Sequence, residues 1–352
     1  MKVLHTSDLH LQEARGERWE TLQKILKICE DEEINVLAIC GDLFDKNPDI
    51  KDLRKAVQEL FSDNEFDTLI IPGNHDAEVC GDMYFGDRGK LLSGSSRTKN
   101  YPETRFVGLP CKELRKEEVL DEIRRLRGTL SDDKTNILLY HGELLDAFYA
   151  GENYGEEEGR TMPVKLSYFR ELPIGYVLAG HFHTNFSIWQ MDNGGFFVYS
   201  GSPIPIKRKE TGKRKVNIFE VGKPPSPRTL DVPFYQPIDL TLDPIENENP
   251  LKEIEERVEH VDPNAIVLLT VDAYINSEKI GLSETEFAEQ VKKIAKKRTT
   301  EGPKIKVRDI SRILEHDLFR DFMEKLEQLN FAEEKERQLR NIAIRAMMRA
   351  NL

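Results

Sequence analysis

Five short strand-like runs in the first part of the chain each end next to a polar side chain that can bind metal or carry protons. The runs occupy residues 3–7, 35–39, 69–73, 137–140 and 176–180. Short apolar runs bounded by glycine or proline are typical of buried strands in a sheet that is covered on both faces. Polar groups directly after such strands meet at one edge, where open α/β sheets place their sites. The pattern predicts an α/β protein with a functional site at that edge.

The segments between these runs contain apolar residues at helical spacing, which predicts helices that cover the sheet. The helices are predicted over residues 18–31, 49–61 and 113–126. Strands are predicted over residues 105–109, 186–189, 196–199 and 216–219. The last three are expected to be antiparallel, joined by turns and part of a second sheet packed on the first. Residues 77–100 are rich in Gly and Ser and are expected to form surface loop.

Two stretches in this part of the chain are strongly charged. Residues 151–159 hold three successive glutamates between glycines and are interpreted as a solvated loop near the site entrance. Residues 207–215 contain six basic side chains in nine positions. They are interpreted either as an exposed hairpin tip kept soluble by its charge or as a contact with a phosphate backbone.

A proline-rich stretch, residues 223–233, predicts a domain boundary. Beyond it, strands and helices alternate, which indicates a small α/β module. Strands over 238–242, 265–274 and 304–307 alternate with helices over 251–261 and 283–296, and the second of these helices begins with a capping box. Residues 317–352 predict one or two amphipathic helices, whose apolar stripes either pack on the protein itself or dock a partner.

The whole-chain composition limits the classes of protein to consider. The 352 residues predict a large domain with one or two smaller modules. The net charge of -12 argues against a nucleic-acid binder, although local basic patches and bound cations weaken that objection. Four cysteines without a pairing pattern, no signal-peptide pattern and no membrane-length apolar stretch indicate a soluble, cytoplasmic protein with reduced thiols.

The polar groups at the five strand ends form a set of oxygen and nitrogen metal ligands. They are Asp8, His10, Asp42, Asn74, His141, His181 and His183. Mixed carboxylate, imidazole and amide ligands without thiolates favour Mn²⁺ or a similar ion over structural zinc. Two divalent ions about 3.5 to 4 Å apart can share a hydroxide that attacks phosphorus in line. The pattern therefore predicts a two-metal phosphoesterase site.

Each predicted ion has four ligands, and Asp42 is the predicted bridge between the ions. One ion would be held by Asp8, His10, Asp42 and His183, and the other by Asp42, Asn74, His141 and His181. His75 belongs to neither set and is predicted to stabilise the transition state or to act as general acid. Asp45 and Asp76 are interpreted as partners of His75 or of a ligand, or else as residues that cap a helix or turn.

These motifs resemble those of the calcineurin-like metallophosphoesterase superfamily. The matching stretches are Ser7-Asp8-Leu9-His10-Leu11, Gly41-Asp42-Leu43-Phe44-Asp45, Gly73-Asn74-His75-Asp76, His141-Gly142-Glu143 and Gly180-His181-Phe182-His183. Within the superfamily, residues 5–11 and 199–203 resemble the SbcD double-strand-break repair nucleases and their archaeal and eukaryotic counterparts. Two positions depart from the family's pattern. Asp45 is the residue of bacterial members, where archaeal and eukaryotic ones carry His, and Gln12 stands where Gly is common.

The resemblance implies a fold, an activity and partners. The fold is a two-sheet metallophosphoesterase sandwich flanked by helices, with a small α/β cap domain and C-terminal helices. The domains are a nuclease core over residues 1–222, a DNA-binding cap over 234–310 and an ATPase-docking segment over 311–352. The activity is manganese-dependent 3′ to 5′ exonuclease and single-strand endonuclease cleavage of DNA in double-strand-break repair. The enzyme is expected to be a homodimer joined to an SMC-like ABC ATPase of the SbcC type.

Two other functions stay open at this point. A phosphodiesterase for a small substrate, such as a cyclic nucleotide or a phosphoprotein, would use the same metal chemistry but has less need of a cap and terminal helices. A non-catalytic scaffold would keep the fold for partner binding, but it has no need to keep every ligand. The remaining histidines, His5, His260 and His316, are interpreted as structural.

Overall fold

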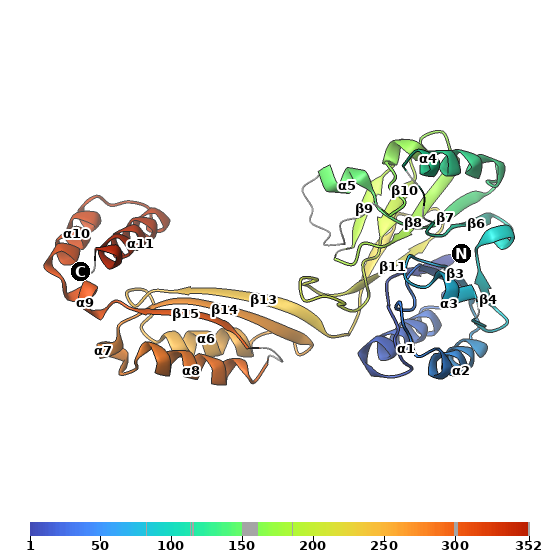
Figure 1. Ribbon diagram of the computed structural model, residues 1–352. Coiled ribbons are helices and arrows are strands. Elements are labelled where there is room, and N and C mark those ends of the chain that lie inside the picture. Colours follow the sequence, from blue (N-terminus) through green and yellow to red (C-terminus); the bar gives the residue numbers. More distant parts are fainter. Residues whose placement is uncertain are drawn as a thin grey trace. The chain divides into compact units, whose positions relative to one another are not determined.

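The chain folds into two compact units, Met1–Tyr235 and Gln236–Leu352, and each is described by itself (Figure 1). The computed structural model describes residues 1–81, 83–112, 114, 116–149, 161–184, 186–298 and 302–350. The loop predicted over residues 151–159 lies outside the described residues.

The first sheet of the first unit has six strands in the order β12-β11-β1-β2-β3-β4. Its strands are β1 (Lys2–Thr6), β2 (Val36–Cys40), β3 (Asp67–Ile71), β4 (Gly89–Leu91), β11 (Lys215–Glu220) and β12 (Ser226–Thr229). β1 to β4 run parallel, and β11 pairs antiparallel with the free edge of β1. The carboxyl ends of β1, β2 and β3 therefore lie at the same edge of this sheet.

The second sheet also has six strands, in the order β5-β6-β7-β8-β10-β9. Its strands are β5 (Thr98–Asn100), β6 (Thr104–Leu109), β7 (Thr135–His141), β8 (Ile174–Gly180), β9 (Ser187–Gln190) and β10 (Phe196–Tyr199). The four central strands are parallel to one another, and β5 and β9 form the antiparallel edges. The carboxyl ends of β7 and β8 are consequently neighbours.

Helices cover the outer faces of both sheets, so the first unit is a two-sheet sandwich flanked by helices, as predicted (Figure 1). The helices are α1 (Gly16–Asp31), α2 (Ile50–Ser62), α3 (Ala77–Gly81), α4 (Lys116–Arg125) and α5 (Leu145–Tyr149), with 3-10 turns η1 (Gly94–Ser96), η2 (Leu126–Gly128) and η3 (Leu166–Phe169). Leu22 of α1 shares a core with Leu37 of β2, whereas Ile123 of α4 shares another with Leu138 of β7. A third core lies between the sheets.

One predicted strand belongs to the other sheet. β9 and β10 pair antiparallel as predicted, but β11 pairs with β1, where Phe219 lies opposite Val3. Alternating apolar residues identify a strand without specifying its neighbour, and pairing with β1 buries Phe219 between the sheets. Residues 200–214 therefore cross from one sheet to the other, and the prediction of a hairpin tip at 207–215 is wrong.

Two stretches that were expected to be irregular contain short elements. Residues 77–100 hold α3, β4, η1 and β5, each only three to five residues long. Such lengths are too short to show a period, and β4 forms because its main chain extends the ladder of β3. Within the proline-rich stretch, β12 pairs with β11, so this stretch contains an edge strand of the first sheet. The boundary between the two units comes just after the predicted stretch, between Tyr235 and Gln236.

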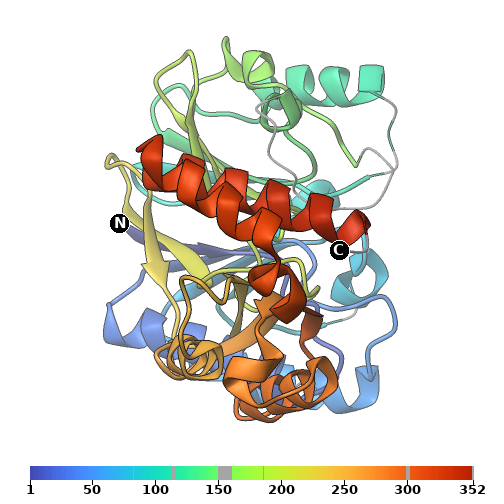
Figure 2. The ribbon, with the colours of Figure 1, turned by 90° about the vertical axis from the view of Figure 1, so that its left-hand side faces the viewer.

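The second unit contains the small α/β module that the sequence predicts. β13 (Phe234–Leu242), β14 (Ala265–Ile275) and β15 (Lys304–Asp309) form its sheet in that order, and β14 and β15 are parallel. α6 (Pro250–Glu259) and α8 (Glu284–Ala295) lie side by side on one face of the sheet (Figure 1, Figure 2). The predicted capping box at the start of α8 is present, between Ser283 and Glu286. The short helix α7 (Ser277–Ile280) precedes α8.

The chain continues into α9 (Ser311–Glu315), α10 (Asp317–Gln328) and α11 (Glu333–Arg349). Part of their apolar surface packs on the protein itself, because Phe319 and Ile344 share a core with Tyr274 of β14. Other apolar side chains are accessible, among them Leu318 and Ile342, which are 55% and 63% exposed. Packing on the protein itself is therefore confirmed for one face of these helices, and partner docking stays a prediction for the accessible side chains.

The three histidines interpreted as structural have positions of that kind. His316 accepts the N–H of Leu318 at the start of α10, and Nδ1 of His260 lies 2.7 Å from the Glu256 carbonyl at the end of α6. His5 lies in β1 on the same face as Val3, which is part of the core between the sheets. Burial lowers the pKa of His5 to about 3.

This burial predicts an acid-sensitive contribution to stability. Between pH 3 and 6.5 the unfolded chain binds a proton at His5 and the folded chain does not, so stability falls as the pH falls through this window. We expect His5→Leu to remove this contribution. Urea unfolding in EDTA at pH 7.5 and pH 5 should show that the wild type loses about 2 kcal/mol more than the variant. Equal losses would contradict a neutral, buried His5.

Candidate metal centre

Five strand ends bring the predicted ligands to one place in the first unit. Asp8 and His10 follow β1, Asp42 follows β2, Asn74 follows β3, His141 is the last residue of β7, and His181 and His183 follow β8. The two sheets pack face to face across a shared apolar core. The carboxyl ends of their central parallel strands therefore meet. Each ligand lies at such a strand end, where the hydrogen bonding between strands stops.

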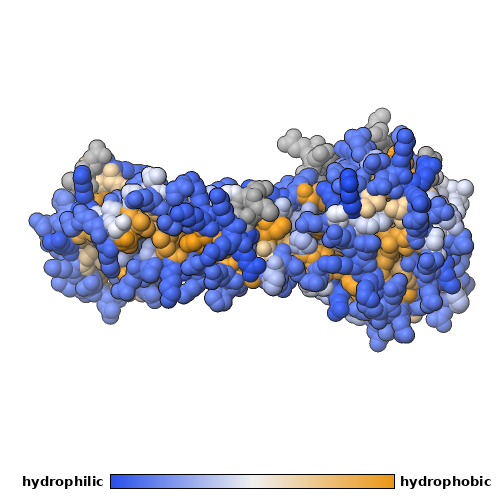
Figure 3. All heavy atoms as spheres, turned by 90° about the horizontal axis from the view of Figure 1, so that it is seen from below, coloured by the Kyte–Doolittle hydropathy of each residue, from blue (hydrophilic) through white to orange (hydrophobic). Residues whose placement is uncertain are grey.

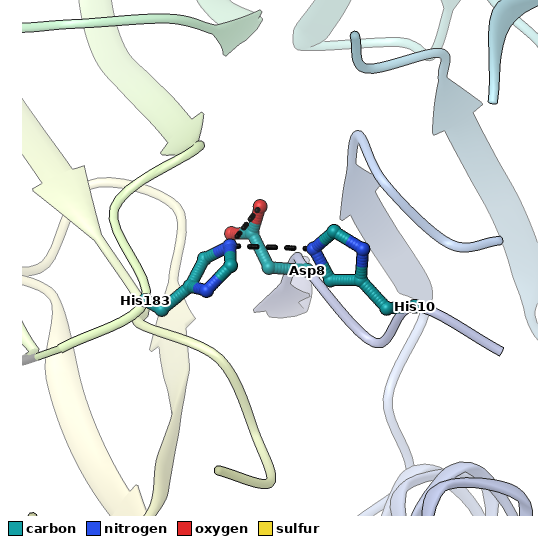
Figure 4. Close-up of side chains that lie close together, drawn as sticks. All are labelled: Asp8, His10 and His183. Carbon is teal, nitrogen blue, oxygen red and sulfur yellow. Dashed lines mark hydrogen bonds and ion pairs between the residues drawn. The ribbon is translucent and has the colours of Figure 1, made fainter. Parts of the chain in front are cut away.

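His183 lies at one end of this cluster (Figure 4). Its Nε2 atom is 3.3 Å from Nε2 of His10 and 3.7 Å from Oδ1 of Asp8. All three side chains are buried. Their donor atoms are close enough to one another to hold a single ion.

Asn74 lies at the other end, between two histidines of the second sheet. Its Oδ1 atom is 3.0 Å from Nε2 of His141 and 3.3 Å from Nδ1 of His181. Asp42 joins the two ends, because its Oδ2 atom is 3.7 Å from Nε2 of His10 and 3.5 Å from Nε2 of His141. The structure thus brings all seven predicted ligands into one continuous cluster.

The cluster needs positive charge at its centre. Nδ1 of His141 lies 2.9 Å from the Cys40 carbonyl oxygen, which can only accept, so this nitrogen carries a proton. The other ring nitrogen then faces oxygen atoms of Asp42 and Asn74. Burial opposes charge on the His141 ring, but the Asp42 carboxylate outweighs it and raises the pKa of His141 to about 9. A divalent cation at this position would supply the same charge and leave the ring neutral.

Two more histidines fit a cation for different reasons. Burial lowers the pKa of His10 to about 4, with the Asp42 carboxylate opposing in part, so the His10 ring is neutral at pH 7 and can offer a lone pair. Nδ1 of His181 is the ring nitrogen that faces the cluster, 3.3 Å from Oδ1 of Asn74, whereas its Nε2 lies 3.8 Å from Oε1 of Glu143. With two carboxylates and an amide oxygen, these nitrogens form a donor set that suits divalent ions of the Mn²⁺ type.

The backbone is strained where the ligands stand. Among the described non-glycine residues, seven have positive φ, and four of them are predicted ligands: Asp8 at 56°, His10 at 50°, Asp42 at 50° and His181 at 101°. Side chains other than glycine rarely adopt this conformation, and such strain concentrates at functional sites. The main chain therefore turns sharply after β1, β2 and β8, where these four ligands stand.

Residues 1–185 match the family model described as calcineurin-like phosphoesterase, and this match covers more than half of the chain. The chain belongs to the calcineurin-like phosphoesterase family. The resemblance seen in the motifs is thereby confirmed at the level of the superfamily. Members of this family have centres of two metal ions, and the cluster described above provides the residues that could hold them.

This phosphoesterase is similar to a curated protein of Methanocaldococcus jannaschii named DNA double-strand break repair protein Mre11. The two are 26% identical over 230 residues, which are 60% of this chain and 58% of the relative. The chain thus spans little more than half the length of that relative.

Solved structures also align with the phosphoesterase. TT1561 of Thermus thermophilus aligns with 61% of this chain and 92% of its own, at 14% identity and a TM-score of 0.40. A dimetal phosphatase from Danio rerio aligns with 62% of this chain and 91% of its own, at 11% identity and a TM-score of 0.40.

The face of the phosphoesterase seen from below (Figure 3) exposes mainly hydrophilic residues, in keeping with the 32% of residues that are charged. No helix in the described part of the chain combines the length and the apolar character needed to cross a membrane.

His75 lies beside the cluster and is partly accessible. Its Nε2 atom is 4.0 Å from Oδ2 of Asp42, and its side chain is 20% exposed. The two departures from the family's pattern meet next to it. Asp45 lies 3.7 Å from Nδ1 of His75, and its other oxygen accepts a hydrogen bond of 2.9 Å from Gln12. The Asp45 side chain also accepts from Arg18 of α1.

Asp76 holds two of the site loops together. One oxygen accepts from the Gly73 N–H at 2.8 Å and the other from the Phe44 N–H at 3.1 Å. These hydrogen bonds connect the turn after β3 to the turn after β2. Asp76 therefore acts on the loop backbones, and the interpretation of it as a residue that stabilises a turn is the one that its contacts support.

Sequence reasoning missed two buried charged residues next to His183. Oε1 of Glu210 lies 3.0 Å from Nδ1 of His183, and Arg214 donates to the carbonyl oxygens of His183 and Ser202. Both belong to the basic stretch 207–215, where their neighbours are exposed lysines and arginines. A single acidic residue among six basic ones was the signal that could have identified Glu210.

Two glycines of the motifs leave room for the ligands. A Cβ atom on Gly73 would lie 2.0 Å from Oδ1 of Asp42, and one on Gly41 would lie 2.0 Å from Nδ1 of His141. Neither neighbour can move away without leaving the cluster. Glycine is therefore required at both positions by the close approach of a ligand.

This close approach allows the role of Asp42 in metal binding to be tested without replacing any ligand. Gly73→Ala should displace the Asp42 carboxylate and weaken Mn²⁺ binding by about tenfold or more, as measured by isothermal titration calorimetry. Gly128→Ala is the matched control, because a Cβ atom there meets nothing within 4 Å. Wild-type affinity in a folded Gly73→Ala variant would show that Asp42 does not bind the ion.

Proposed function

We propose that this phosphoesterase is a metal-dependent DNA nuclease. The observation that carries the proposal is the cluster of seven oxygen and nitrogen donors, joined by Asp42, at the meeting point of the two sheets. The similarity to a protein named DNA double-strand break repair protein Mre11 supports DNA as the substrate. The expected activities are 3′ to 5′ exonuclease and single-strand endonuclease cleavage.

The ligands divide into two sets that share one carboxylate. Asp8, His10, Asp42 and His183 would hold one ion, and Asp42, Asn74, His141 and His181 would hold the other. Mn²⁺ is the proposed metal, because the donors are carboxylate, imidazole and amide without thiolate. Two such ions, when bound, supply Lewis-acid activation of water and of the phosphoryl oxygens.

The remaining steps fall to side chains of the chain itself. His75 is the one partly exposed histidine at the edge of the cluster, so a substrate can reach its ring. We assign it the stabilisation of the leaving oxygen, by a hydrogen bond or by proton donation. The Asp45 carboxylate beside Nδ1 would favour a proton there and orient the ring, and Gln12 and Arg18 hold that carboxylate in place.

The second unit and the terminal helices have proposed roles in binding. From sequence, the roles are assigned to a core over residues 1–222, a DNA-binding cap over 234–310 and a docking segment over 311–352. The first compact unit extends the core to Tyr235, because β12 belongs to its first sheet. The exposed apolar side chains of α10 and α11 suit contact with a partner, for which we propose an SMC-like ABC ATPase of the SbcC type. The proposed assembly contains two copies of this chain.

A phosphodiesterase acting on a small substrate is the second candidate. It would use the same seven donors and His75, so the site itself does not separate the two functions. The presence of a folded second unit and of accessible apolar helices favours a macromolecular substrate, since a small phosphodiester needs neither.

His75→Ala tests the catalytic assignment. We expect end-labelled single- and double-stranded oligonucleotides to be shortened from the 3′ end with Mn²⁺. The variant should lower that rate by about a hundredfold or more, because it removes a proton donor but no ligand. Mn²⁺ stoichiometry should stay normal, and Lys51→Ala, an exposed change on α2 of the first unit, serves as control. Hydrolysis of bis-p-nitrophenyl phosphate without any oligonucleotide cleavage would favour the second candidate.

The docking assignment is tested by changing only accessible side chains. Replacing Leu318 and Ile342 by Asp should abolish co-purification with the ATPase while bis-p-nitrophenyl phosphate hydrolysis stays at the wild-type rate. Arg337→Ala, an exposed change on α11, should keep the complex intact. Undiminished co-purification of the double variant would assign docking to another surface.

A further inference from the structure

The stretch 207–215 is basic in sequence, yet two of its charged residues are almost completely buried. Glu210 is 1% exposed and Arg214 is 3% exposed, whereas Arg208, Lys209 and Lys213 are exposed. Removing an ion from water costs several kcal/mol unless its charge and its hydrogen-bonding groups find partners. Solubility does not explain charged side chains that water cannot reach, so these two require another reason.

Both oxygens of Glu210 are used. Oε1 lies 3.0 Å from Nδ1 of His183, and Oε2 accepts a hydrogen bond of 2.7 Å from the Ile206 N–H. An ionised carboxylate only accepts, so the proton of the His183 ring must be on Nδ1. The other ring nitrogen is then left with its lone pair, and this atom is the one that faces Asp8 and His10 (Figure 4).

Arg214 fixes the main chain around the same histidine. Its guanidinium donates to carbonyl oxygens of Ser202 at 2.9 Å and of Thr184 at 3.2 Å, and also to that of His183. These carbonyls belong to the loop after β8 and to the segment after β10. A single side chain therefore joins the loop that bears His183 to the crossing segment that bears Glu210.

We propose that Glu210 is a positioning residue for His183 and that Arg214 holds the two segments in the register this contact needs. A carboxylate on the outer nitrogen of a metal-binding histidine selects the tautomer, fixes the ring and raises the basicity of the inner nitrogen. The crossing segment from β10 to β11 thus completes the half of the centre formed by Asp8, His10 and His183. The inference rests on the metal site of the proposed function but not on DNA as its substrate.

The position of Glu210 predicts an effect on one ion only. Glu210→Ala should weaken binding of one of two Mn²⁺ ions by about ten- to a hundredfold and leave the other near its wild-type affinity. Asn74, His141 and His181 lie at the opposite end of the cluster and do not contact Glu210. Titration of metal-free protein with Mn²⁺, followed by electron paramagnetic resonance, resolves the two affinities. Lys209→Ala, an exposed neighbour in the same segment, is the matched control and should bind both ions normally.

Glu210→Gln is the second variant, for the case that Glu210→Ala does not fold, because glutamine keeps the shape of the side chain. Thermal unfolding in EDTA identifies which variants are folded before metal is added. Histidine ¹⁵N spectra of the metal-free protein should show His183 protonated at Nδ1 in the wild type, with that population reduced in Glu210→Gln. A role confined to packing would lower the melting temperature without changing the tautomer.

The outcomes separate this inference from the proposed function. Normal affinity for both ions in folded Glu210→Ala and Glu210→Gln variants, or an unchanged His183 tautomer, would overturn the positioning role and leave the nuclease proposal standing. Selective weakening of one ion in a protein that cleaves no DNA would support the positioning role and refute the nuclease. A wild-type protein that binds no Mn²⁺ would refute both.

Discussion

The first unit depends on one electrostatic constraint. Seven electron-pair donors, six of them buried, converge at one place and have few protons between them. Asp42 has histidine nitrogens on both sides, and Asn74 likewise lies between two rings. In the protein alone, the Asp42 carboxylate draws a proton onto His141 against the effect of burial. Such a site is costly for folding, and the surrounding structure must hold it open until a cation provides the missing charge.

The support comes from packing between the sheets and from short hydrogen-bonded links behind the ligands. The apolar core between the sheets holds β1 and β2 against β7 and β8, so the two halves of the cluster are fixed by one shared, buried core. Asp76 ties the turns after β2 and β3 through main-chain N–H groups. Positive φ angles at four ligands are tolerated because these strands and links leave the turns no alternative conformation.

The charged residues around the centre are placed according to what they support. The buried Asp76 acts on neighbouring main chains, the buried Glu210 contacts the ring of His183, and the partly exposed Asp45 contacts a histidine that a substrate can reach. The basic stretch 207–215 contains both buried and exposed charged residues. Its buried members contact the cluster and its exposed members face water, so a local excess of positive charge lies close to a site built from carboxylates in an acidic protein.

Much of this protein was determined by local sequence. Strand-like runs ending in Gly-Asp, Gly-Asn-His or Gly-His-x-His predicted the buried parallel strands and the ligands that follow them. Parallel strands have their carboxyl ends at the same edge of a sheet, so residues that follow these ends lie together. The helices, the α/β module of the second unit and the cap of α8 also follow from spacing over a few residues. In each case the decisive interaction is between residues close together in the chain.

Tertiary structure decided the remaining features, which depend on partners far apart in sequence. β11 alternates like any half-buried strand, and only the free edge of β1 and the core between the sheets assigned it to the first sheet. That pairing turned an expected hairpin into a crossing segment, and the crossing placed Glu210 against His183, 27 residues earlier in the chain. Composition suggested a solvated basic loop there. The charge of a segment does not show which of its side chains will be buried by parts of the chain that are distant in sequence.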